Sequence, residues 1–153
     1  MRVADPRSDR RLASSKLLLV RAGLVLIVIV CGLALRGYGF QLGLPAFVVK
    51  YGGSLLWATM VFFLVSIALP HLTRRDAAFI AFAVAIMVEL SRLIHTPWLD
   101  VFRLTLAGAL LLGRIFSAWN IVAYGAGILF GGWLDWLVGK YSERTIDRAQ
   151  AQR

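Results

Sequence analysis

Residues 17–35 read LLLVRAGLVLIVIVCGLAL, an apolar run in which Arg21 is the only charged side chain. About 20 mostly apolar residues in a helix cross the ~30 Å hydrocarbon core of a bilayer. The run therefore predicts a membrane-spanning helix, and the rest of the chain repeats the pattern.

Three further stretches have the same character, at 54–69, 77–94 and 115–138. A fifth apolar piece, 104–112, is too short to span at ~1.5 Å per residue, so we expect a re-entrant or interfacial helix there. The sequence thus predicts an all-α integral membrane bundle of four transmembrane helices, with this short helix between the third and fourth spans. Residues 36–53 are expected to form a long loop rich in glycine.

Composition excludes an ordinary soluble domain and a disordered chain. The 153 residues are 59% hydrophobic and 16% charged, whereas soluble domains have about 45–50% apolar and about 25% charged residues. The single cysteine, Cys31, and two distant histidines form no metal-binding motif. No nucleotide-binding motif is visible either, so we expect no metal and no cofactor.

The distribution of charge predicts the orientation. Of the 17 basic residues, twelve fall in the N-terminal tail, the first span, the 70–76 loop and the C-terminal tail, on one side of a four-span bundle. The positive-inside rule then places both termini in the cytoplasm. We expect a cytoplasmic basic tail at 1–15, the transmembrane bundle at 16–141 and a cytoplasmic polar tail at 142–153. The net charge of +9 is expected to attract anionic lipid, not nucleic acid, because no recognition motif accompanies it.

Glu89 is the most informative residue, because a carboxylate inside a membrane is costly unless it is paired. Counted back from Pro97, it lies about 10 Å below the outer boundary. Arg92 follows three residues later on the same helical face, which predicts an intramembrane ion pair. Two interpretations stay open: the pair holds helices in register, or Glu89 or His95 acts as a general base.

Basic residues on the outer side suggest a binding site. Arg36, Arg92 and Arg103, joined by Lys50 and Arg114, would surround the acids Glu89 and Asp100. Arginine binds phosphates through its planar fork, so this cluster predicts a pocket for an anionic headgroup. The alternatives are arginines that reach to lipid phosphates and an aspartate that stabilises a helix N-terminus.

Polar and small residues of the fourth span predict helix packing. Ala123, Gly127 and Gly131 are four apart, which lets helices approach closely within the chain or in a homo-oligomer. Asn120 is expected to find a polar partner, and Asp135 to meet water or Lys140.

Three motifs resemble those of a family of small bacterial multi-pass membrane proteins of unknown function, which is similar to the VanZ-like group. They are GSLLWA at 53–58, ELSR with HTPWLD and Arg103 at 89–103, and Gly113, Phe116, Trp119-Asn120 and Tyr124. Arg36 also falls where that family tends to carry an arginine. The resemblance implies the fold, a bacterial membrane location and polar packing roles for Ser54, Trp57, Asn120 and Tyr124, but no established reaction.

The chain departs from the family pattern at three positions. Ser54, Arg92 and Asn120 stand where the family usually has Asp, Gln and Asp. The departures remove acids and add a base. Two interpretations stay open: this member lacks an activity that the family's acids carry, or its more cationic pocket suits an anionic headgroup.

Three hypotheses about function follow. The first is a bacterial inner-membrane protein of the cell envelope that binds an anionic lipid or polyprenyl-linked precursor headgroup at the outer pocket. The second is a membrane enzyme that acts on a lipid-linked substrate. The third is a structural or accessory subunit without chemistry.

Overall fold

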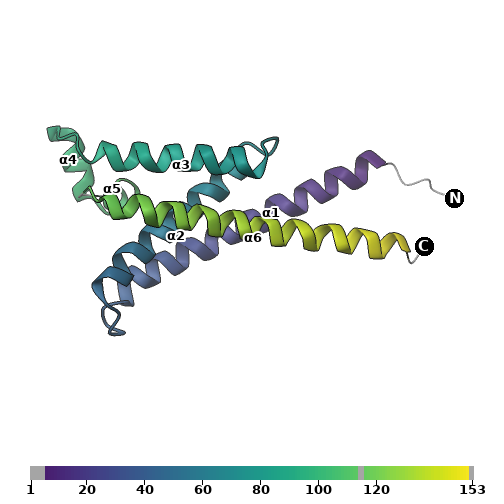
Figure 1. The fold of residues 1–153 in the computed structure, drawn as a ribbon, viewed down its shortest axis with the longest axis horizontal. Coiled ribbons are helices and arrows are strands. Elements are labelled where there is room, and N and C mark those ends of the chain that lie inside the picture. The colour runs from purple at the N-terminus through teal and green to yellow at the C-terminus, as the bar shows by residue number, and fades with distance from the viewer. Residues whose placement is uncertain (1–5, 114–115, 152–153) are drawn as a thin grey trace.

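The computed structural model describes the backbone of residues 6–113 and 116–151 and the side chains of 15–113 and 116–141. Over these residues the chain is entirely helical, with no β-strand (Figure 1). The helices are α1 (Pro6–Tyr38), α2 (Ala46–Ala68), α3 (Arg74–Ser91), α4 (Pro97–Leu104), α5 (Leu106–Leu111) and α6 (Ala118–Ala151). Both chain ends lie at the same end of the molecule (Figure 1), which we call the termini end.

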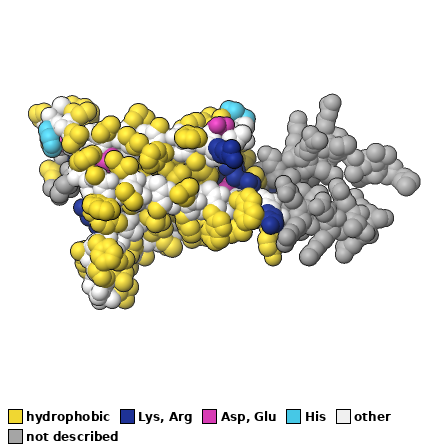
Figure 2. Space-filling model, in the orientation of Figure 1, with side chains coloured by type: hydrophobic (Ala, Val, Ile, Leu, Met, Phe, Trp, Pro, Cys, Tyr) yellow, Lys and Arg dark blue, Asp and Glu magenta, His cyan; other side chains and the backbone are white. Residues whose placement is uncertain are grey.

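Three of these helices contain segments long and apolar enough to cross a membrane: Ser15–Tyr38, Ala46–Ala68 and Ala118–Tyr141. The all-helical class predicted from the sequence is confirmed over the described residues, and by length and composition these three segments suggest a membrane protein. The third predicted span corresponds to α3, which has 18 residues and carries four charged side chains, at 74–76 and 89. Large apolar side chains cover most of the surface seen in Figure 2, as expected for helices that face lipid.

The boundaries of two helices differ from those predicted. α2 begins at Ala46, eight residues before the predicted start, so the loop after α1 is much shorter than expected. Pro45 immediately precedes this helix, where its missing N–H and fixed φ are tolerated. α3 ends at Ser91 instead of residue 94, and the chain turns before Pro97 begins α4.

The short apolar piece between the third and fourth predicted spans forms two helices, α4 and α5. They are separated at Thr105, whose side chain accepts a hydrogen bond from the Gly108 N–H and so caps α5. The two helices leave large apolar side chains exposed, including Trp98, Val101 and Leu106. The arginine on α4, Arg103, is turned inward.

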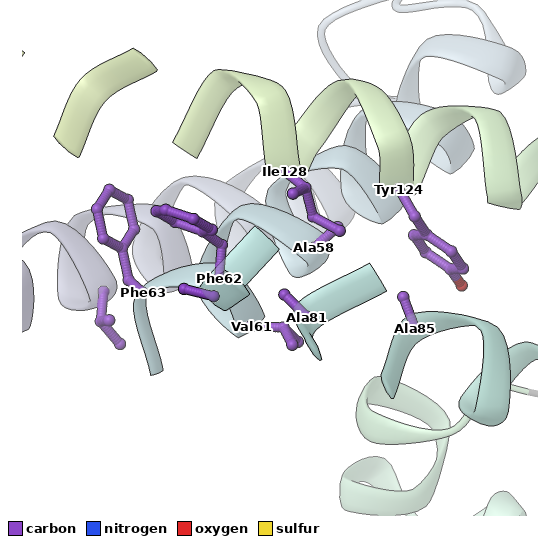
Figure 3. Close-up of a cluster of buried hydrophobic side chains, with 10 residues drawn as sticks. Ala58, Val61, Phe62, Phe63, Ala81, Ala85, Tyr124 and Ile128 are labelled. Carbon is purple, nitrogen blue, oxygen red and sulfur yellow. The ribbon is translucent and has the colours of Figure 1, made fainter. Parts of the chain in front are cut away.

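α2 is the central helix of the bundle. It packs against α1, α3 and α6, and α6 also packs against α3 and α1. Figure 3 shows the buried side chains where α2, α3 and α6 meet, with Ile128 of α6 directed toward Ala58 of α2 and Ala81 of α3 near Val61 of α2. Alanines at intervals of four on α3, which are Ala77, Ala81 and Ala85, let this helix come close to its neighbours.

Glycines of α6 permit a close approach to α2. A Cβ atom at Gly127 would overlap the Leu55 carbonyl oxygen and lie 3.0 Å from the Leu55 carbonyl carbon. The Thr59 hydroxyl crosses the same contact and donates to the Gly127 carbonyl over 2.8 Å. At Gly131, a Cβ would meet the ring of Phe62. Two of the three small residues predicted for close packing therefore serve a contact inside the chain.

Candidate functional site

The Glu89 carboxylate lies fully buried in the last turn of α3 and is surrounded by donors from the chain itself. Its Oε1 accepts from the backbone N–H of Ser117 over 2.7 Å and from the Asn120 amide over 3.2 Å. Its Oε2 accepts from the Tyr124 hydroxyl over 2.7 Å and lies 2.7 Å from Arg92 Nη1. The predicted Glu89–Arg92 ion pair is confirmed.

Arg92 joins this carboxylate to the segment before α6. Its Nε donates to the Leu112 carbonyl over 2.6 Å, and its Nη2 donates to the Tyr124 hydroxyl over 3.0 Å. Gly113 makes room for the guanidinium, because a Cβ there would lie 2.6 Å from Arg92 Nη2, and its φ of 69° favours glycine. The pair therefore ties the end of α3 to the start of α6 through both partners.

The structure brings the motif residues of three helices into one group. Asn120 Oδ1 accepts from the Ser54 hydroxyl of α2 over 3.1 Å, while its amide nitrogen faces Glu89. The Trp57 ring lies 5.4 Å from the Tyr124 ring, in a tilted arrangement. The three positions that depart from the family pattern, 54, 92 and 120, all belong to this group. We call these residues the Glu89 cluster: Ser54, Trp57, Glu89, Arg92, Asn120 and Tyr124.

Arg103 lies beside the Glu89 cluster and binds the end of α3. Its side chain is only 4% exposed. It donates to the carbonyls of Ser91 and Ile94 and pairs with Asp100 at 3.1 Å. Ser91 is the last residue of α3 and Ile94 lies in the turn that follows, so the guanidinium ties α4 to the end of α3 and to this turn. Within the described part of the chain, Arg103 Nε and Thr96 Oγ1 are buried without a hydrogen-bond partner.

Two other predicted residues lie at the surface. The His95 side chain is 71% exposed, and its Nδ1 lies 3.5 Å from the half-exposed carboxylate of Asp100. Arg36 is exposed in the last turn of α1. The tip of the α1–α2 hairpin, where Arg36 lies, and the α4–α5 segment form separate corners of the molecule (Figure 1). Arg114, also predicted for this side, lies outside the described residues.

Two arginines at this end are paired with acids of the chain. Glu89 is matched by Arg92, and Asp100 by Arg103. Both oxygens of Glu89 are already occupied by donors of the chain, so the geometry equips this carboxylate to fix helices. Among the side chains that the structure describes, no three His, Cys, Asp or Glu residues gather as metal ligands would.

A second buried charge network lies at the termini end and corrects one sequence expectation. Asp135 of α6 meets neither water nor Lys140: it is 1% exposed and pairs with two arginines. Arg21 of α1 binds it through two bonds, of 2.7 and 3.1 Å, and also donates to the Ser66 carbonyl of α2. Arg74 of α3 binds it at 2.9 Å. A buried carboxylate stays ionised at low cost only when it is paired, and this one joins four helices.

Sequence reasoning treated Arg21 and Asp135 separately and missed their pairing. The signal was present, because each is a charge inside an apolar segment and both segments place that charge toward the termini end. Opposite charges at one depth in neighbouring helices favour pairing.

We expect Asp135→Asn to lower the free energy of unfolding by about 1.5 kcal/mol, in the range of hydrogen bonds to charged groups. The loss is modest because the substituted side chain keeps an amide oxygen that can accept from Arg21, which also keeps its bond to the Ser66 carbonyl. Arg74 is 48% exposed and can turn to water. Unfolding in detergent micelles, followed by tryptophan fluorescence, measures the change. A variant as stable as the parent protein would contradict the role given to this carboxylate.

Comparison with known proteins places the chain in a family. No solved structure matches it. The profile of the family described as protein of unknown function DUF2809 matches residues 43–128, which is more than half of the chain. The matched range contains α2 to α5 and the start of α6, and therefore the whole Glu89 cluster. The chain belongs to the DUF2809 family of proteins of unknown function.

Proposed function

We propose that this chain is a four-span protein of a bacterial inner membrane that works as a structural or accessory subunit, without chemistry of its own. The observation that carries the proposal is the Glu89 cluster. Its buried carboxylate and guanidinium are bonded to the chain on all sides, and their charges cancel. Such a cluster fixes the outer end of the bundle.

The proposed topology takes α3 as the fourth span. Helix α3 together with Arg92, the residue that follows it, rises about 27 Å, close to the ~30 Å of a hydrocarbon core. Residues 77–88 between the charged ends are all apolar. We further infer that both termini are cytoplasmic, from the excess of basic residues at the termini end. The bacterial origin and the relation to the VanZ-like group rest on the motif resemblance.

The proposed role of α4 and α5 is to lie at the outer membrane interface. Their exposed side chains are apolar, whereas Arg103 is turned toward α3. An amphipathic helix at the surface of a soluble protein instead buries its apolar side chains and exposes its charged ones. The exposed apolar side would face lipid, which supports the interfacial form of the short helix.

An anionic headgroup site at the outer end is the second candidate, and two atoms favour it. Arg103 Nε and Thr96 Oγ1 are buried donors that lack a partner among the described residues; Thr96 immediately precedes α4, and Arg103 lies in its last turn. Buried donors are usually satisfied, by protein or by water. A phosphate oxygen of a lipid or polyprenyl-linked headgroup would satisfy them. In this candidate the bonds of Arg103 to Ser91, Ile94 and Asp100 hold the guanidinium in place.

The enzyme hypothesis receives the least support from the geometry. A general base needs a free lone pair within reach of a substrate, whereas the Glu89 oxygens accept from four groups of the chain. His95 is exposed beside Asp100. The sequence places no nucleophile motif near it.

Native mass spectrometry of the gently extracted protein tests the proposal against the headgroup site. We expect the parent protein and the Arg92→Gln/Arg103→Gln variant to retain the same lipids, because these arginines bind the chain itself. Circular dichroism serves as the control that the variant is still helical. Retention of one anionic lipid by the parent and its loss from the folded variant would contradict the structural proposal and establish the headgroup site.

A further inference from the structure

We propose that the termini end carries a binding site for the headgroup of an anionic phospholipid, formed by Arg74 of α3 and Lys140 of α6. This site lies at the opposite end of α3 from the Glu89 cluster. It does not depend on the function proposed for that cluster, and Lys140 and Asp135 lie outside the range that matches the family profile.

Arg74 is a surplus charge on the Asp135 network. Arg21 already satisfies both oxygens of the carboxylate and is 12% exposed, so this pair is neutral and buried. Arg74 adds a second guanidinium through Nε alone, and its side chain is 48% exposed. The network therefore presents one net positive charge at the surface, on a guanidinium that is held in place by its bond to Asp135.

Lys140 adds a second positive charge on α6, one residue after the position that Arg74 contacts. A Cβ at Gly139 would lie 2.6 Å from Arg74 Nη2, so the guanidinium rests against α6 at the residue before Lys140. The Lys140 ammonium lies 4.7 Å from the centroid of the Trp136 ring. Glycine at 139 thus lets the Arg74 guanidinium of α3 rest against α6 one residue before Lys140.

The surrounding residues place this pair of cations at the level of lipid headgroups. Trp133, Trp136 and Tyr141 are exposed in the last turns of the apolar segment of α6. Exposed tryptophan and tyrosine gather where acyl chains give way to headgroups. A lipid bound here would contact the rings with its upper acyl chain and glycerol, and the cations with its phosphate.

The charge of this end suits an anion. Of the described side chains at the termini end, five are basic and two are acidic, and one of the acids is the buried Asp135. The other, Asp76, accepts from the Thr73 hydroxyl that caps α3. Figure 2 shows Lys and Arg side chains gathered where the described surface adjoins the tails. Near a membrane surface each such charge strengthens attraction to anionic lipid by about five-fold.

The full chain in non-ionic detergent micelles, titrated with dioleoylphosphatidylglycerol and followed by native mass spectrometry, tests the site. We expect tighter binding of this lipid than of dioleoylphosphatidylcholine. Arg74→Gln/Lys140→Gln should weaken phosphatidylglycerol binding by about 25-fold, or about five-fold per charge. Asp135 stays paired with Arg21 in the Arg74→Gln variant. Lys140→Gln alone disturbs no buried group and should lower the affinity for phosphatidylglycerol by about five-fold.

Lys50→Gln is the matched control. Lys50 is also an exposed lysine over an aromatic ring, 5.1 Å from the centroid of Tyr51, but it lies at the opposite end of the bundle. The Lys50→Gln variant should bind phosphatidylglycerol as the parent protein does, and so should the Arg92→Gln/Arg103→Gln variant. The proposal is overturned if the termini-end double variant keeps the parent affinity, if Lys50→Gln loses as much, or if the two lipids bind equally. Displacement of the lipid by equimolar inorganic phosphate would also overturn it, in favour of a soluble anion.

Discussion

Replacing Glu89 with alanine should lower the free energy of unfolding by about 3–5 kcal/mol, the cost of leaving one partner of a buried ion pair alone. Arg92 would keep its bonds to Leu112 and Tyr124, but its charge would be buried without a counter-ion. The Ser117 N–H and the Asn120 amide would lose their acceptor as well. Unfolding in detergent micelles at several denaturant concentrations measures the loss.

Asp100→Ala provides a matched control for this variant. Asp100 also pairs with an arginine three residues later, Arg103, but the carboxylate is half-exposed. Arg103 is buried, but it keeps its bonds to the Ser91 and Ile94 carbonyls, and water reaches the half-exposed position of Asp100. We therefore expect a loss of about 1.5 kcal/mol, smaller than that of Glu89→Ala. Equal losses in the two variants would show that burial of Glu89 has no special role.

Gly127→Ala is expected to have the second largest effect. The new methyl group would overlap the Leu55 carbonyl oxygen, which belongs to the backbone of α2 and cannot rotate away. The two helices must therefore move apart, which also lengthens the bond from Thr59 to the Gly127 carbonyl. Overpacking of this kind costs about 1–3 kcal/mol, and we expect a loss near the upper limit.

Gly132→Ala makes the same change five residues later on the same helix. A Cβ there would be 3.9 Å from the Phe62 ring, an ordinary contact. Alanine is favoured over glycine within a helix by about 1 kcal/mol in water, so this variant should be as stable as the parent protein or more stable. A Gly127→Ala variant that matches Gly132→Ala in thermal unfolding would rule out the close contact between α2 and α6.

The sequence predicts the helical class because apolar runs of about 20 residues have few alternatives in a membrane. The first and last predicted spans coincide with apolar segments of α1 and α6. The sequence predicts a start of α2 that is eight residues too late, because Gly52 and Gly53 favour a loop over a helix. In the structure both lie inside the helix, where the neighbouring turns pack against α1.

Parts of the site were predictable where the partners are near in sequence. The Glu89–Arg92 pair follows from a spacing of three on one helix. The bonds from Ser117, Asn120 and Tyr124 to the same carboxylate depend on how α3 meets α6, which no local pattern specifies. The Asp135 network could not be predicted from a local pattern either, because it joins residues more than 60 positions apart.

The predicted outer pocket separates into residues with different surroundings. Arg92 and Arg103 are buried and bonded to the chain, whereas Arg36 and His95 are exposed at different corners. Charge counting along the sequence placed them on one side of a membrane, but it could not distinguish an arginine that binds a carbonyl of its own chain from one that faces a ligand.

The central claim is that Glu89 and Arg92 act as one internal unit that fixes the outer end of the bundle, and a double-mutant cycle tests it most directly. Glu89→Gln, Arg92→Gln and the double variant are compared by their free energies of unfolding. We expect each single variant to be destabilised, because each leaves one buried charge without its partner. The double variant should be more stable than the sum of the single losses predicts, by at least about 1 kcal/mol. Additive losses would contradict the account, since they would mean that the two side chains act independently.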